Sequence, residues 1–269
     1  MMATTGVNKL TRYVRFIRLM LHILSGVLQS FILPYVSISR QNQMTCNWAQ
    51  KFLRIIRVQL SVDGGLPACG PQGVILVANH ISWLDILVIL AAYPVRFVAK
   101  AEISTWPLLG RLCRNAETLF IEREKRSDTL RINQQIDSVL KSGHSIVIFP
   151  EGTTGNGDVL QHFHASLLQS AVTTKALLCP VAIHYSNCCD DSRNASVAYV
   201  NVTILQSLMQ ILAEPKIRAE LIFCEPVPSA DRNRRELARL AEKAIARTLS
   251  LNVVHTAAEI PSDLPAERM

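Results

Sequence analysis

A histidine and an aspartate stand five residues apart in ANHISWLD, directly after the apolar run VILV. The β-branched run predicts a buried strand that ends near Asn79, and the apolar residues beyond it predict a helix that begins near Ser82. Asp85 would then lie in the first turn of the helix, where its carboxylate could accept the Nδ1–H of His80. This contact would leave Nε2 as a general base. The alternative is structural, with Asp85 capping the helix and His80 packed beside it.

Two further stretches place polar residues just beyond predicted strands. TLFIER ends in Arg123, whose planar guanidinium can hold a phosphate or carboxylate through two parallel hydrogen bonds. Its alternative is an ion pair with a neighbouring glutamate. FPEGTTG follows the run SIVI, and its Glu151, Gly152 and Thr153 leave room for backbone N–H groups and hydroxyls to approach a polar ligand. Taken alone, this stretch is equally compatible with an ordinary tight turn.

Strands and helices alternate from residue 74 to residue 250, and these elements must position the polar residues. Apolar, β-branched runs predict strands at 74–79, 96–100, 118–123, 145–150, 177–185 and 218–227. Apolar residues at helical spacing predict helices at 83–93, 104–116, 127–143, 164–175 and 233–250. The alternation predicts an α/β fold, with a mixed, largely parallel sheet flanked by helices and with its chemistry in the loops at the strand ends.

The first sixty residues differ from the rest in charge. They hold eight lysines and arginines and no acidic residue, which leaves 20 basic against 21 acidic residues in the remainder. The uncharged stretch 19–38 is close to the ~20 residues that span a bilayer core, and the arginines before it favour the cytoplasmic side. It could span the bilayer or dip into one leaflet as a helical hairpin. Residues 47–62 resemble an interfacial amphipathic helix with basic side chains toward anionic headgroups.

We therefore expect a membrane-anchoring helical segment over 1–60, the main domain over 61–250 and a loose tail over 251–269. Basic residues gathered at one end argue against nucleic-acid binding, which needs them along a groove with aromatic residues between them. Seven cysteines without a CxxC pair or ligand spacing predict reduced thiols and no metal site. The chain has no GxSxG, GxGxxG, GxxxxGK[ST] or HExxH motif.

Four stretches of the chain have the order and spacing of four sequence blocks of one known family: NHISWLD, TLFIERE, FPEGTTG and CPVAIHY. Over about residues 70–190 the sequence resembles the glycerolipid acyltransferases, whose best-known members are the 1-acylglycerol-3-phosphate acyltransferases. The resemblance implies a membrane enzyme at the cytoplasmic face of the inner membrane. It would move a fatty acyl group from acyl-CoA or acyl-carrier protein to the hydroxyl of a lysolipid. No cofactor, metal or covalent enzyme intermediate is implied.

The same resemblance implies roles for individual residues. His80 would be the general base on the acceptor hydroxyl, and Asp85 would orient it. Arg123 would bind the acceptor's phosphate or another anionic headgroup. The loop residues that would shape the acceptor site are Glu151, Gly152 and Thr153. The oxyanion of the tetrahedral intermediate would need N–H donors, which backbone groups near these loops can supply.

Two departures from the family pattern bear on the acceptor. Glu117 stands where the family usually has glycine, and Thr154 stands where it commonly has arginine. We place 1-acyl-sn-glycerol-3-phosphate first as acceptor, which would give phosphatidate for phospholipid biosynthesis. Because a cation is missing, lyso-ornithine lipid is the close alternative. Two other classes remain: a non-catalytic membrane adaptor, disfavoured by the intact His/Asp and FPEG stretches, and a hydrolase, disfavoured by the missing nucleophile elbow.

Overall fold

The computed structural model describes residues 7–67, 72–107, 109–122 and 126–254. Its α-helices are α1 (Lys9–Ser30), α2 (Ile38–Ile55), α3 (Leu84–Ala92), α4 (Leu109–Asn115), α5 (Arg126–Lys141), α6 (Gln169–Thr174), α7 (Ile204–Ala213) and α8 (Arg234–Leu249). Short 3-10 helices are η1 (Leu33–Tyr35), η2 (Ala101–Thr105), η3 (Ser166–Leu168) and η4 (Ala195–Val197). The strands are β1 (Val58–Asp63), β2 (Ile75–Ala78), β3 (Arg96–Lys100), β4 (Leu119–Ile121), β5 (Ile146–Ile148), β6 (Leu160–Gln161), β7 (Leu178–Asn187), β8 (Ile217–Phe223) and β9 (Val253–Val254).

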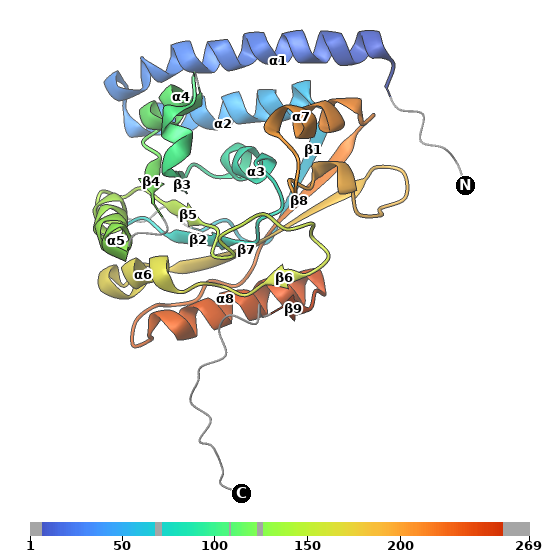
Figure 1. The fold of residues 1–269 in the computed structure, drawn as a ribbon. Helices are drawn as coiled ribbons and strands as arrows, with labels where there is room; N and C mark the ends of the chain where they lie inside the picture. Colours follow the sequence, from blue (N-terminus) through green and yellow to red (C-terminus); the bar gives the residue numbers. More distant parts are fainter. Residues whose placement is uncertain (1–6, 68–71, 108, 123–125, 255–269) are drawn as a thin grey trace, which may run out of the picture.

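A mixed sheet with the strand order β1-β8-β7-β2-β5-β3-β4 forms the centre of the fold (Figure 1). Its neighbouring strands pair in parallel, with the exception of the antiparallel pair β7 and β8. A separate short parallel ladder joins β6 to β9. The α/β class and the mixed, largely parallel sheet expected from the sequence are confirmed.

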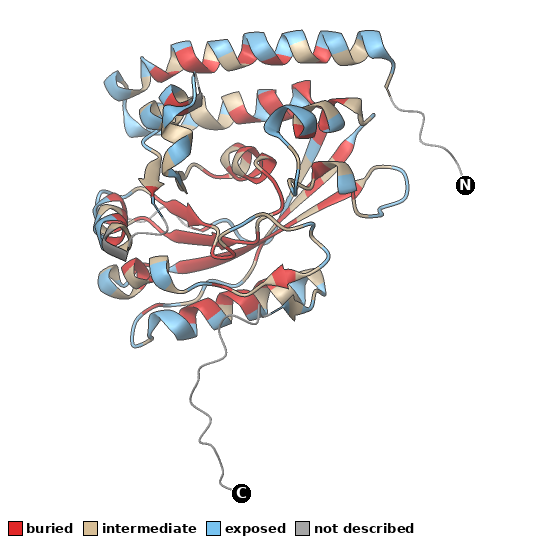
Figure 2. Cartoon of the chain, viewed as in Figure 1, coloured by how far each residue is buried: buried red, intermediate tan, exposed pale blue. Residues whose placement is uncertain are grey.

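Helices bury both faces of the sheet, and Figure 2 shows the buried residues gathered in the strands and on the helix faces turned toward them. Strand β2 illustrates why. Leu76 and Ala78 join the core beneath α2 and α3, whereas Ile75 and Val77 join the core formed with α5, α6 and α8. A strand with both faces covered needs apolar residues at every position, which explains the unbroken run VILVA.

Several expected boundaries hold and others need correction. The strand expected at 96–100 is β3 as observed. The amphipathic helix expected over 47–62 is wrong beyond residue 55, because α2 ends at Ile55 and Arg57 takes a left-handed φ of 63°. The chain then enters the edge strand β1, so the expected domain boundary at residue 60 falls inside a strand. Helix α7 and the β6–β9 ladder were not expected from the sequence.

Two other expected segments are shorter than the sequence indicated. The helix expected over 104–116 is divided into η2 and α4, with Trp106 and Pro107 between them. Within the expected loose tail, 251–269, Val253 and Val254 form β9 and pair with β6. Residues 255–269 lie outside the described part of the chain, as does Cys69. The six described cysteines form no disulfide.

Helix α1 runs along the outside of α2 and is fastened to the body (Figure 1). The guanidinium of Arg15 donates to the carbonyl oxygens of Leu212 and Glu214, at 3.1 and 2.7 Å, and so satisfies free carbonyls at the end of α7. Farther along α1, the ring of His22 stacks on Trp48 of α2 with centroids 5.1 Å apart. The Trp48 indole N–H donates to the carbonyl oxygen of His22 at 3.1 Å. One face of α1 is therefore packed against the protein.

The opposite face of α1 is apolar and exposed. Within the described residues, one segment, Lys9–Tyr35, is long and apolar enough to cross a membrane by length and composition alone. Large apolar side chains that are more than a third exposed recur along it: Leu10, Tyr13, Val14, Ile17, Met20, Leu21, Leu24, Leu28, Phe31, Ile32 and Tyr35. Such a stripe is much larger than scattered surface apolar residues and marks a surface that contacts a lipid or a protein.

Candidate active site

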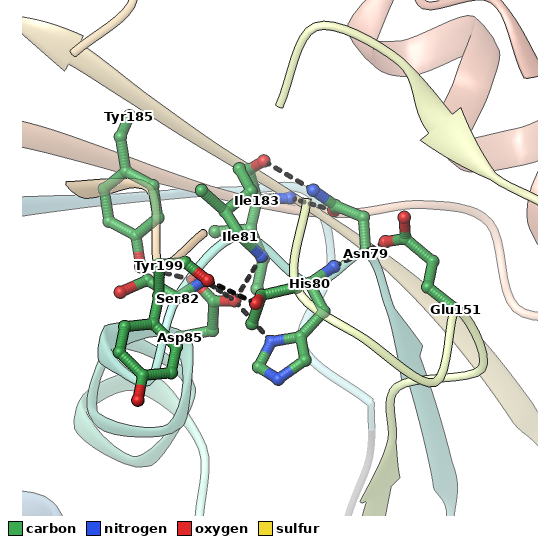
Figure 3. A network of polar contacts seen from close by, with 10 residues as sticks. Asn79, His80, Ile81, Ser82, Asp85, Glu151, Ile183, Tyr185 and Tyr199 are labelled. Atoms are coloured by element: carbon green, nitrogen blue, oxygen red, sulfur yellow. Dashed lines mark hydrogen bonds and ion pairs between the residues drawn. The ribbon is translucent and has the colours of Figure 1, made fainter. Parts of the chain in front are cut away.

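The HISWLD and FPEGTTG stretches meet where the parallel strands β2 and β5 end (Figure 3). The ladder between β2 and β7 closes at the pair Ala78 and Val181. Beyond it, the side-chain amide of Asn79 takes the place of the backbone, donating to the Ile183 carbonyl oxygen at 3.0 Å and accepting from the Ile183 N–H at 2.8 Å. The backbone is thereby free to turn at His80 toward α3.

His80 and Asp85 form the contact that their spacing predicted. The imidazole Nδ1 lies 2.8 Å from Asp85 Oδ2, and Asp85 is fully buried in the first turn of α3. The same oxygen accepts the backbone N–H groups of Ile81 and Ser82, at 2.7 and 2.9 Å. A carboxylate only accepts hydrogen bonds, so Nδ1 carries a proton. Asp85 thus organises the turn before the helix and holds the imidazole as well; the two alternatives from the sequence coexist.

Tyr185 is a further hydrogen-bond partner of Asp85, and the sequence does not predict this contact. Its hydroxyl donates to Asp85 Oδ1 at 2.8 Å, and its side chain is 1% exposed on β7. Burial and the charge of Asp85 raise the pKa of Tyr185 well above its ordinary value, which keeps the hydroxyl protonated. The partners lie 100 residues apart, and no local pattern links them.

One face of the His80 imidazole packs against an aromatic ring. Phe149 stacks on it with ring centroids 4.1 Å apart and an interplanar angle of 17°. The His80 side chain is 18% exposed, and in Figure 3 its second ring nitrogen points away from Asp85 and Glu151. Within the described residues no hydrogen bond forms at Nε2. The geometry therefore leaves this nitrogen able to accept a proton.

Glu151 supports the backbone of the histidine. Its Oε1 accepts the His80 N–H at 2.6 Å, and its Oε2 accepts the Gln161 N–H at 2.9 Å. The residue is 5% exposed, and burial raises its pKa from 4.5 to about 7, although the two backbone N–H groups act in the opposite direction. Both oxygens face the protein, so the structure places Glu151 as a brace between the two loops.

The rest of the FPEGTTG loop packs against the turn that contains His80. Gly152 has a left-handed φ of 73°, which favours glycine, and the Gly155 N–H donates to the His80 carbonyl oxygen at 2.8 Å. Thr153 is exposed. Thr154 donates its hydroxyl to the Tyr199 carbonyl oxygen at 2.5 Å. The residue that replaces the family's arginine therefore ties this loop to the segment before α7.

The expected anion-binding residue, Arg123, lies outside the described residues. Glu117, the other departure from the family pattern, adopts a left-handed φ of 54° and forms an ion pair with Arg96. A left-handed backbone explains why glycine is usual at this position. Among the described residues, no group of three or more His, Cys, Asp or Glu side chains could hold a metal ion.

The buried Glu151 predicts a specific pH dependence of stability. Its folded pKa lies above the unfolded value, so its contribution is fully present below pH 4.5 and is lost as the pH rises through about 7. Relative to Glu151→Gln, the wild type should lose on the order of 3 kcal/mol of unfolding free energy across this window. Denaturant unfolding at a series of pH values measures it. The exposed Glu225→Gln is the control, and parallel curves for wild type and Glu151→Gln would contradict the prediction.

Comparison with known proteins agrees with this architecture. A family model described as Acyltransferase matches residues 63–184. The lyso-ornithine lipid O-acyltransferase of Pseudomonas aeruginosa is 35% identical over 206 residues, which cover 76% of this chain and 78% of that protein. The 1-acyl-sn-glycerol-3-phosphate acyltransferase of Neisseria gonorrhoeae is 37% identical over 169 residues, which cover 62% and 65%.

A solved structure shares the fold. The crystal structure of the 1-acyl-sn-glycerophosphate acyltransferase PlsC from Thermotoga maritima matches with a TM-score of 0.63 over 88% of this chain and 96% of that chain, at 20% identity. Fold and sequence together define an enzyme of the acyltransferase class. The chain belongs to the acyltransferase family, and the resemblance to the glycerolipid acyltransferases is confirmed.

Proposed function

We propose that the protein is a membrane-bound O-acyltransferase that uses His80 as its general base. The observation that carries this proposal is the imidazole held by Asp85 through Nδ1, with Nε2 left to accept a proton. Nε2 takes the proton of a lysolipid hydroxyl as the hydroxyl oxygen attacks the thioester carbonyl carbon of acyl-CoA or acyl-carrier protein. The carbon–sulfur bond then breaks, the thiolate takes the proton from the imidazolium, and the new ester remains on the lipid. Neither a metal nor a covalent enzyme intermediate takes part.

The acceptor headgroup is the finer part of the proposal. The relatives include acyltransferases named for 1-acyl-sn-glycerol-3-phosphate and for lyso-ornithine lipid. Two observations favour lyso-ornithine lipid over 1-acyl-sn-glycerol-3-phosphate as the acceptor. The Pseudomonas relative aligns with more of this chain, and Thr154 offers a neutral hydroxyl that is already bonded to the Tyr199 carbonyl oxygen. An ornithine headgroup carries an ammonium group beside its carboxylate, so it demands less positive charge than a phosphate monoester. Arg123, Gly152 and Thr153 remain proposed acceptor-site residues, and Glu151 is proposed to shape the site through its bonds to the His80 and Gln161 N–H groups.

A direct competition between the two lysolipids tests the acceptor. Purified protein is incubated with a labelled acyl thioester and equal amounts of lyso-ornithine lipid and 1-acyl-sn-glycerol-3-phosphate. We expect the labelled ornithine lipid to form in excess. Labelled phosphatidate as the main product would restore the order first drawn from the sequence. Running the competition with acyl-CoA and with acyl-carrier protein also identifies the donor.

The arrangement of α1 supports a specific mode of membrane binding. A helix fastened to α2 and α7 along one face, with a continuous apolar stripe along the other, is suited to lie in one leaflet. A full crossing would require the contacts of Arg15 and His22 with the body to break. We therefore propose that residues 9–35 dip into the leaflet. The basic residues of the first sixty positions support the further proposal that this leaflet lies on the cytoplasmic side of the inner membrane.

Replacing two leucines of the stripe should release the protein from lipid. Leu21 and Leu28 are 63% and 61% exposed and lie two turns apart on one face of α1. Burying each leucine in lipid contributes about 1.5–3 kcal/mol, so the double change to asparagine should weaken binding to anionic vesicles by more than about a hundredfold. The matched control is Leu130→Asn, since Leu130 is 65% exposed on α5, away from α1 (Figure 1). Equal sedimentation of both variants with vesicles would contradict this membrane contact.

A further inference from the structure

We infer that Tyr185 is a positioning residue for acyl transfer, acting through Asp85 on the base His80. This inference rests on the proposed function, because it assigns a role in a reaction in which His80 removes the proton. Tyr185 lies on β7, far in sequence from the HISWLD stretch, and its hydroxyl is one of four donors to the two carboxylate oxygens of Asp85.

The two carboxylate oxygens of Asp85 have unequal surroundings. Oδ2 accepts three N–H groups, from the His80 imidazole and from the backbone of Ile81 and Ser82. For Oδ1, the bond from the Tyr185 hydroxyl at 2.8 Å is the one formed within the described residues. Asp85 is fully buried, so no solvent replaces a missing donor. The Tyr185 hydroxyl therefore determines how strongly the negative charge of the Asp85 carboxylate acts on the His80 imidazole.

Strand β7 holds both ends of the HISWLD turn. Ile183 bonds the side chain of Asn79, the residue before His80, and Tyr185 bonds Asp85, the residue that orients it. These two anchors lie two residues apart on one strand. Because β7 pairs with β2 on one side and β8 on the other, it is a rigid support. Figure 3 shows Tyr185 and His80 on opposite sides of the Asp85 carboxylate.

Removing the hydroxyl should have two effects on catalysis. The Asp85 carboxylate loses one restraint, and a loss of alignment of this kind lowers kcat by about tenfold to a hundredfold. Oδ1 also loses its donor, so the carboxylate attracts the proton on the imidazolium more strongly. The acid limb of kcat/KM, which reports the free enzyme's base, should therefore move to higher pH. A tyrosine that only fills space would not move this limb.

The test compares Tyr185→Phe with wild type in acyl transfer to a lysolipid across the pH range. Glu151 also faces the turn, through the His80 N–H, and is unchanged in the variant. The matched control is Tyr93→Phe, because Tyr93 is 5% exposed and its hydroxyl lies 3.5 Å from Ser145 Oγ, at the amino ends of the strands. We expect the acid limb to rise in Tyr185→Phe and to stay at the wild-type position in Tyr93→Phe.

Site-specific replacement of Tyr185 by 3-fluorotyrosine provides a second measurement that does not depend on the phenylalanine variant folding. The fluorinated phenol is a stronger donor, so it should draw charge from Asp85 and move the acid limb to lower pH. Shifts in opposite directions for the two replacements would support the positioning role. An unmoved limb in both would overturn it while His80→Ala remained inactive, whereas an active His80→Ala would instead overturn the proposed function.

Discussion

Replacing His80 with alanine should abolish acyl transfer while leaving the protein folded and bound to membranes. A positioned general base contributes about 10²–10⁴-fold to rate, and its loss should appear in kcat with labelled thioester and lysolipid. Folding should survive because Asp85 Oδ2 keeps the Ile81 and Ser82 N–H groups and Oδ1 keeps the Tyr185 hydroxyl. The buried charge thus remains hydrogen-bonded when the imidazole is removed.

A second histidine provides the matched control for this variant. His144 lies two residues before the start of β5, at the amino ends of the parallel strands, whereas His80 follows the carboxyl end of β2. We expect His144→Ala to transfer acyl groups at close to the wild-type rate. Added imidazole should restore part of the activity of His80→Ala, since the space beside Phe149 and Asp85 then accepts a free base. Wild-type activity in His80→Ala would show that another group removes the proton.

Asp85→Asn should reduce kcat by about 10²–10⁴-fold. The asparagine side chain has one oxygen and one amide nitrogen. In one orientation the amide oxygen faces Ile81 and Ser82, and the neutral side chain no longer offers a negative charge to the imidazolium. In the other orientation the amide nitrogen faces His80 and donates to Nδ1, which fixes the imidazole proton on Nε2, the wrong tautomer for a base. Both orientations impair proton transfer.

Thermal unfolding of Asp85→Asn separates this chemical effect from a loss of fold. The expected outcome is a folded protein with low kcat and a nearly unchanged KM, because the lipid-binding surfaces are untouched. If the variant kept nearly full activity and lost only stability, Asp85 would act as an organiser of the turn before α3 and His80 would not depend on it.

The local patterns of the sequence were sufficient for the central elements and for the dyad. The strand and helix around His80 are set by an unbroken apolar run and by the residues of α3, and both signals lie within twenty residues. The pair His80 and Asp85 could be predicted because five residues bridge one strand end and one helix turn. The fold class followed from the alternation of strands and helices between residues 74 and 250.

What could not be predicted depends on contacts between distant residues. Glu151 and His80 are 71 residues apart, and Tyr185 and Asp85 are 100 apart, so neither pair leaves a periodic signal. The end of α2 depends on a left-handed Arg57, which propensity disfavours. The packed face of α1 likewise required the structure, because Arg15 looks like a flanking charge until the end of α7 is placed beside it.

The most direct measurement follows thiol release and lipid product together in one reaction of the purified wild-type protein. With a labelled acyl thioester and a lysolipid, we expect one diacyl product for each thiol released, and thiol release that requires the lysolipid. Thiol release without lysolipid, with the label recovered as free fatty acid, would contradict acyl transfer and identify a hydrolase. No thiol release with either lysolipid would identify a non-catalytic protein with this fold.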